Sequence, residues 1–70
     1  MEVIVFATTV QSTEQVKTLA PQINQLAGKG RWNFALDDCD KILRIVSDNL
    51  NPEDAVALLK KYGFECNELN

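Results

Sequence analysis

The chain has 70 residues, of which 46% are hydrophobic and 24% are charged. These proportions are those of an ordinary globular domain, so they exclude a disordered tail, a collagen-like repeat and a disulfide-dense secreted knot. Folding at this length buries only roughly 60 to 65% of the surface that the unfolded chain exposes. We therefore expect residues 1–70 to form one small domain with a modest core.

Charge and side-chain chemistry narrow the function classes further. Ten acidic against seven basic residues give a net charge of −3, and histidine is absent. An acidic surface is a poor match for nucleic-acid phosphates, and histidine is the commonest general base and metal ligand near neutral pH. The composition therefore argues against a nucleic-acid-binding protein and against an enzyme.

The first residues do not resemble a targeting signal. Val3–Phe6 is too short for the apolar core of a signal peptide, and no apolar run approaches the ~18 residues that cross a bilayer. We therefore expect a cytoplasmic protein without a membrane partner. In that compartment Cys39 and Cys66 are expected to remain free thiols.

The first third of the chain predicts a strand and a helix. Val3–Phe6 is β-branched and aromatic throughout, which is typical of a central strand. Ser12 and Gln15 have the spacing of a capping box, and apolar residues at intervals of three and four follow as far as Ala27. Pro21 lies inside this pattern and removes one backbone hydrogen bond. Two alternatives follow: one helix that bends at Pro21, or two shorter helices.

The middle of the chain predicts a hairpin. Apolar residues alternate with others over Trp32–Leu36, and a second strand is expected over Lys41–Val46. Between them, Asp37–Asp40 is rich in residues that form turns.

The last third predicts a helix and a short strand. Asn51 supplies a helix cap and Pro52 the first helical position, whereas Gly63 supplies a stop. Alternation over Phe64–Leu69 then predicts the last strand.

The resulting order is βαββαβ. Two right-handed crossovers of this kind interleave into a four-stranded antiparallel sheet with both helices on one face. We therefore predict an α+β, ferredoxin-like two-layer sandwich with strand order 4-1-3-2. In it, the turn before the first helix, the hairpin turn and the turn before the last strand lie at one end of the sheet.

Alternation along the two central strands divides their side chains between the helices and the open face of the sheet. Toward the helices we expect Val3, Val5, Leu43 and Ile45. On the open face we expect Ile4, Phe6, Ile42, Arg44 and Val46. An uncovered face normally carries polar residues, so these apolar groups predict a protein partner or a homodimer. The alternative is that long side chains shield the patch within a monomer.

The chain closes with Pro52-Glu53-Asp54-Ala55-Val56, then Leu59, then Tyr62-Gly63-Phe64. Phe34, Leu36, Leu43 and Ile45 occupy hairpin core positions, and Gly28 ends the first helix. Together these residues resemble the heavy-metal-associated domain family of metallochaperones and metal-pumping ATPases. The resemblance covers nearly the whole chain and implies the ferredoxin-like fold.

The family binds copper or zinc through Met-x-Cys-x-x-Cys on the turn before the first helix. By the resemblance, Val10 stands at the methionine, and Ser12 and Gln15 stand at the two cysteines. Soft Cu(I) takes sulfur donors, and neutral hydroxyl and amide oxygens are poor zinc ligands. We therefore expect the usual metal site to be lost, no cofactor to be bound, and a helix cap to occupy these positions.

Cys39 and Cys66 leave an alternative open. In the simpler interpretation, Cys66 faces the core like Phe64 and Cys39 is an exposed turn residue. In the other, both thiols and a neighbouring aspartate such as Asp38 bind zinc or copper. The two strands nearest these cysteines are separated by two interstrand spacings, or roughly 10 Å. This separation disfavours both a shared metal site and a disulfide. The sequence thus predicts a non-catalytic interaction or regulatory module or, alternatively, a metal-binding or transport module.

Overall fold

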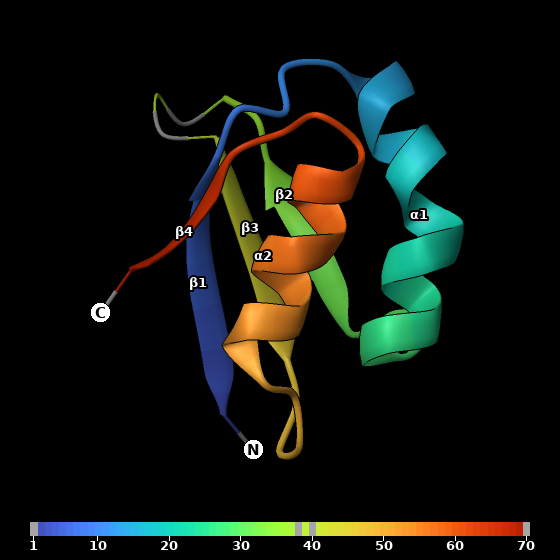
Figure 1. Cartoon of the computed structure of the whole chain (residues 1–70), viewed down its shortest axis with the longest axis vertical. Coiled ribbons are helices and arrows are strands. Elements are labelled where there is room, and N and C mark those ends of the chain that lie inside the picture. Colours follow the sequence, from blue (N-terminus) through green and yellow to red (C-terminus); the bar gives the residue numbers. More distant parts are fainter. Residues whose placement is uncertain (1, 38, 40, 70) are drawn as a thin grey trace.

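The structure is a computed structural model that describes residues 2–37, 39 and 41–69. In chain order the elements are β1 (Val3–Thr8), α1 (Thr13–Ala27), β2 (Trp32–Ala35), β3 (Ile42–Val46), α2 (Pro52–Lys61) and β4 (Cys66–Leu69). The strands form one antiparallel sheet in the order β2-β3-β1-β4 (Figure 1). This is the predicted order 4-1-3-2 read from the other edge, so the predicted strand arrangement is confirmed.

The first helix is continuous, which decides between the two alternatives at Pro21. α1 runs through this residue, and both Pro21 and Lys17, whose carbonyl loses its helical donor, are exposed. Water can therefore solvate that carbonyl. Gly28 ends the helix at a positive φ of 98°, and its N–H donates to the Asn24 carbonyl at 2.9 Å. The predicted stop is therefore confirmed.

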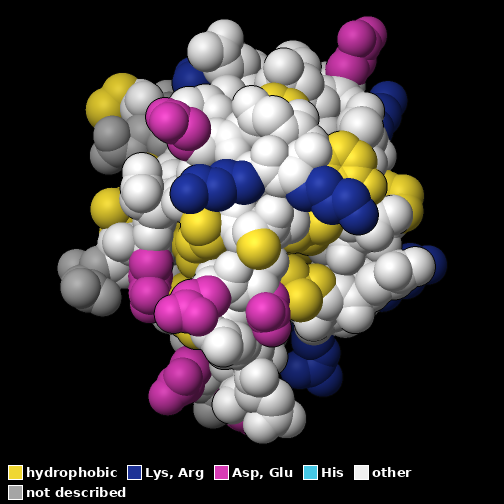
Figure 2. Space-filling view, viewed as in Figure 1, with side chains coloured by type: hydrophobic (Ala, Val, Ile, Leu, Met, Phe, Trp, Pro, Cys, Tyr) yellow, Lys and Arg dark blue, Asp and Glu magenta, His cyan; other side chains and the backbone are white. Residues whose placement is uncertain are grey.

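The second helix begins and ends as its sequence predicts. The Asn51 side chain accepts a hydrogen bond from the Glu53 N–H at 3.1 Å, and Pro52 occupies the first helical position. Acidic residues lie in the first turn and lysines in the last, which complements the helix dipole. Figure 2 shows this division of charge along the helix layer. Among the described residues, neither helix is long and apolar enough to cross a membrane.

The core lies between the two helices and one face of the sheet. Its largest fully buried side chains are Phe6, Val10, Leu19, Ile23, Leu43, Ile45 and Leu59. At the edge of this core, the Trp32 and Phe34 rings pack edge to face with centroids 5.9 Å apart. The Trp32 indole N–H donates to the Asn24 side-chain oxygen at 2.7 Å, which ties β2 to α1.

The register of the sheet corrects the predicted orientation of β1. Ile4 pairs with Ile45 and Phe6 with Leu43, and all four side chains belong to the core cluster beneath the helices. Phe6 is completely buried. The prediction that Ile4 and Phe6 face away from the helices was therefore wrong, whereas the orientation of Leu43 and Ile45 is confirmed.

Val3 and Val5 lie on the other side of β1, although we expected them to face the helices. They pair with Val46 and Arg44, and Val3 is 58% exposed. The ladder pairs define the open face by these residues: Val3, Val5, Ala7, Asn33, Ala35, Ile42, Arg44, Val46, Asn67 and Leu69. The error has a physical cause: β1 is apolar on both faces, so its sequence alternation contains no information about phase.

Candidate functional site

Three connections meet at one end of the sheet, at the top of Figure 1: β1–α1, β2–β3 and α2–β4. Thr8 joins the β1–α1 connection to the β2–β3 connection, because its N–H and its hydroxyl both donate to the Lys41 carbonyl, at 3.2 and 2.7 Å. Thr9 joins the β1–α1 connection to the α2–β4 connection. Its N–H donates to the Glu65 carbonyl at 3.1 Å, and its hydroxyl accepts from the Glu65 N–H at 2.9 Å. The predicted meeting of the three turns is confirmed.

These hydrogen bonds hold an unusual backbone conformation in place. Lys41 has a φ of 51°, in the left-handed region that disfavours residues with a side chain. Its carbonyl accepts the two bonds from Thr8, and its ammonium donates to the Leu36 carbonyl at 2.9 Å across the hairpin. The Thr8 hydroxyl also accepts from the Val10 N–H at 3.2 Å. The polar groups at this end thus bind one another and form a structural junction.

Ser12 and Gln15 form the predicted reciprocal cap. The Ser12 hydroxyl accepts from the Gln15 N–H at 3.2 Å. The Gln15 side-chain oxygen in turn accepts from the Gln11 N–H at 2.7 Å and from the Ser12 N–H at 3.3 Å. Four N–H groups at the start of a helix lack partners within it. The two oxygens that stand at the expected ligand positions therefore stabilise the first turn of α1.

The two cysteines lie in different environments. Cys39 is exposed, whereas Cys66 is only 2% exposed and belongs to the core cluster, as predicted from its phase with Phe64. Burial raises the pKa of the Cys66 thiol from 9.0 to about 11. The thiolate is the form that binds metal ions, so a neutral thiol at Cys66 opposes coordination at neutral pH.

A metal site built on these cysteines needs further ligands. Within residues 2–37, 39 and 41–69, the structure contains no group of three or more cysteine, aspartate or glutamate side chains placed to bind one ion. Asp38, named as a third ligand, lies outside the described residues. The alternative site at Cys39, Cys66 and Asp38 therefore stays a prediction.

The open face presents apolar side chains from several strands, among them Val3 and Leu69, which are exposed. Ile42, Arg44 and Val46 lie on it as predicted, and Ile4 and Phe6 do not. In their place the register brings Val3, Val5 and Ala7 onto this face, and Leu69 joins them from β4. Nothing in the sequence of β1 indicates which of its residues face the helices. That information comes from pairing with β3, where exposed Arg44 shows which side faces solvent.

Leu69 and Ile42 show how unevenly the open face is exposed. Leu69 is 41% exposed, near the edge of the sheet. Ile42 is 6% exposed but lies outside the core cluster, because it points away from the helices. The face thus combines the exposed apolar side chains of Val3 and Leu69 with the exposed amides of Asn33 and Asn67. Its one charged residue is Arg44, which is exposed on an inner strand.

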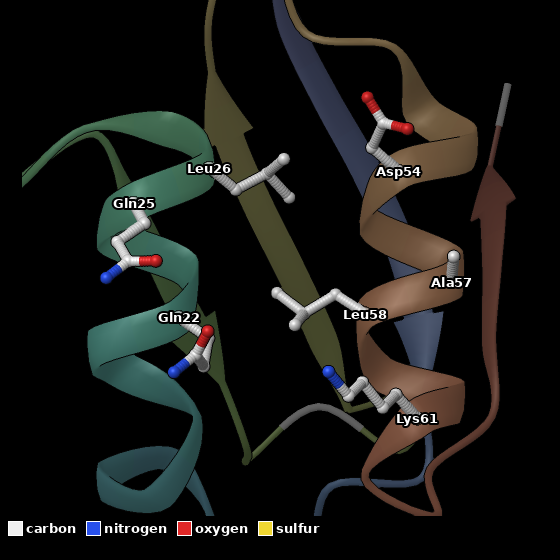
Figure 3. A pocket seen from close by; sticks show the side chains of 7 residues that line it. All are labelled: Gln22, Gln25, Leu26, Asp54, Ala57, Leu58 and Lys61. Carbon is white, nitrogen blue, oxygen red and sulfur yellow. The ribbon is translucent and has the colours of Figure 1, made fainter.

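A groove of about 450 Å³ lies in the helix layer, on the other side of the molecule from the open face. Its lining consists of Gln22, Gln25, Leu26, Asp54, Ala57, Leu58 and Lys61. Leu26 and Leu58 extend toward each other across it, with Asp54 and Lys61 toward its two ends (Figure 3). The groove is broad and open, and Lys61, the amine in its lining, is exposed at the end of α2, where its charge complements the helix dipole.

Neither a family model, nor a curated protein, nor a solved structure matched this chain. The side chains and their positions are therefore the basis for proposing a function. They offer a structural junction at one end, a shallow groove between the helices, and an apolar open face.

Proposed function

We propose that this chain is a non-catalytic interaction module with a ferredoxin-like fold, a cytoplasmic relative of the heavy-metal-associated domain family with a degenerate metal motif. Its task is to bind a protein partner through the open face. The observation that carries the proposal is the exposure of large apolar side chains on this face: Val3 and Leu69 are 58% and 41% exposed. Antiparallel sheets with a free face usually present polar side chains there.

The connections between the strands support the ferredoxin-like part of the proposal. β1 is an inner strand between β3 and β4, and each half of the chain contributes one inner and one edge strand. This interleaving follows from two crossovers of the same hand. Both helices pack into one core cluster on the same face, so no helix of the described residues covers the other face.

The chemistry of the chain supports a non-catalytic role. Histidine is absent, and the Ser12 and Gln15 oxygens serve as a helix cap. Burial also raises the pKa of the Cys66 thiol, which weakens it as a nucleophile at neutral pH. The open face offers apolar side chains, a guanidinium and two exposed amides, those of Asn33 and Asn67, which suit binding of a polypeptide.

A selection from displayed random peptides tests the proposal directly. Peptides enriched on the immobilised protein are expected to bind the wild type and to lose binding to Val5→Asp, because a carboxylate then enters the centre of the open face. Ala57→Asp is the matched control, since Ala57 is exposed on the helix layer. Peptides that bind both variants equally, or a selection without any enriched peptide, would overturn the proposed function.

The loss of the metal motif has its own test. Titration of the reduced protein with Zn²⁺ and with Cu(I) is expected to show no submicromolar site, because the turn before α1 presents Ser12 and Gln15 in place of thiolates. Tight binding that disappears in Cys39→Ser would establish the alternative, a metal module built on the two cysteines. Ser12→Ala is the control at the usual ligand position.

A further inference from the structure

The open face also indicates the chemistry of its partner. Building on the proposed function, we infer that this partner is a short segment of a different polypeptide in which a carboxylate lies among apolar side chains, and that the carboxylate pairs with Arg44. The inference excludes a second copy of this chain as the occupant.

Arg44 is the one charged residue among those that define the open face. It is exposed on β3, an inner strand, and its ladder partners on either side are the neutral residues Val5 and Asn33. No hydrogen bond or ion pair joins its side chain to any residue in the described part of the chain. The guanidinium is therefore available, with an apolar side chain beside it.

Docking of any partner on this face removes water from Arg44. A buried cation without a counter-ion is strongly unfavourable, so an entirely apolar partner binds poorly. A carboxylate on the partner offsets the cost of burying the Arg44 charge, because the planar guanidinium donates two parallel hydrogen bonds to the two carboxylate oxygens. The same apolar surroundings that make an unpaired charge costly also strengthen the ion pair once water is excluded.

A second copy of the chain fits this face badly for two reasons. A two-fold axis brings both copies of Arg44 into one interface whose defining residues include no carboxylate to pair with them, and each copy already has a net charge of −3. The face is also small. Four strands about 4.8 Å apart, each about five residues long, have a flat footprint of roughly 19 by 17 Å, or about 320 Å². A standard interface buries ~800 Å² of accessible surface on each partner, more than a footprint of this size supplies by itself.

A short acidic and apolar segment fits both the charge and the size of the face. An extended segment of about six residues is roughly 20 Å long, which matches the length of the open face. An interface of this size belongs to the weak and transient class. The partner is thus expected to bind and release readily, as in a regulatory contact.

The experiment uses the peptides selected on the full chain and measures their dissociation constants by fluorescence anisotropy. The expected peptides contain aspartate or glutamate flanked by apolar residues, and Arg44→Gln is expected to weaken their binding about tenfold. Lys61→Gln, which removes a positive charge from the helix layer, is the matched control and is expected to leave binding unchanged. Arg44 is exposed, so its replacement leaves the core intact.

The outcomes separate this inference from the proposed function. Peptides that lose binding to Val5→Asp but lack acidic residues, or bind Arg44→Gln as tightly as wild type, would overturn the inference and leave the function standing. Sedimentation is expected to show one chain per particle; a dimer that dissociates in Val5→Asp would identify a second copy as the occupant and also overturn it. Without any peptide sensitive to Val5→Asp, both proposals fail.

Discussion

The two faces of the sheet carry similar side chains in opposite environments. Beneath the helices, Ile4 and Phe6 are 9% and 0% exposed, whereas their neighbour Val3 on the open face is 58% exposed. On the covered face apolar groups supply the free energy of folding. On the open face the exposed groups, Val3 and Leu69, add little to folding, which makes them available for binding. One apolar strand can therefore supply both the core and a contact surface, through residues that are neighbours in the chain.

The largest test of this difference replaces one residue on each face of β1. Phe6→Ala leaves a cavity in the core and is expected to lower the free energy of unfolding by about 3–5 kcal/mol. Val3→Ala is expected to change it by about 0.5 kcal/mol or less. Urea denaturation followed by circular dichroism measures both. Equal losses in the two variants would mean that the assigned phase of β1 is wrong; Phe6→Leu covers the case in which Phe6→Ala does not fold.

A second test concerns the polar end of the covered face. Thr8→Val keeps the shape of the side chain but removes a hydroxyl that donates to the Lys41 carbonyl and accepts from the Val10 N–H. We expect a loss of about 1–3 kcal/mol, because the buried Val10 N–H is left without an acceptor, whereas the Lys41 carbonyl keeps the hydrogen bond from the Thr8 N–H. Thr9→Val is the matched control: its hydroxyl is exposed, so water replaces it and the loss is smaller. A larger effect at Thr9 would contradict the role assigned to burial.

The third test uses the pH dependence of stability. Cys66 pairs with Thr8 on the covered face, and burial raises the pKa of its thiol from 9.0 to about 11. The thiol ionises from pH 9.0 upward in the unfolded chain, but it stays protonated to about pH 11 in the folded chain. Its contribution to the free energy of unfolding is therefore complete below pH 9.0 and is lost as the pH rises toward 11.

The measurement is the urea midpoint across this range, with Cys66→Val as the comparison, because other groups of both proteins titrate there as well. The wild type is expected to lose more stability than Cys66→Val between pH 9 and 11. Cys39→Ser is the control and is expected to follow the wild type, since Cys39 is exposed. Parallel curves for the wild type and Cys66→Val would refute burial of the thiol.

Much of the candidate site could be predicted where a polar residue marks the phase. On β3, Arg44 stands between Leu43 and Ile45, and this contrast correctly placed Ile42 and Val46 on the open face. On β1 every residue from Val3 to Phe6 is apolar. The same reasoning therefore allowed either Val3 and Val5 or Ile4 and Phe6 to face the helices. The junction made by Thr8 and Thr9 could not be predicted either, because its partners are far away in the chain.

The limits of the helices and the order of the elements follow from the residues alone. Caps such as Ser12 and Asn51 and the stop at Gly28 act through neighbours within four residues, so their effect is readable without tertiary contacts. Which side of β1 enters the core depends instead on strand pairing in the folded sheet. A strand that is apolar on both sides accepts either phase until pairing places Phe6 opposite Leu43 beneath the helices.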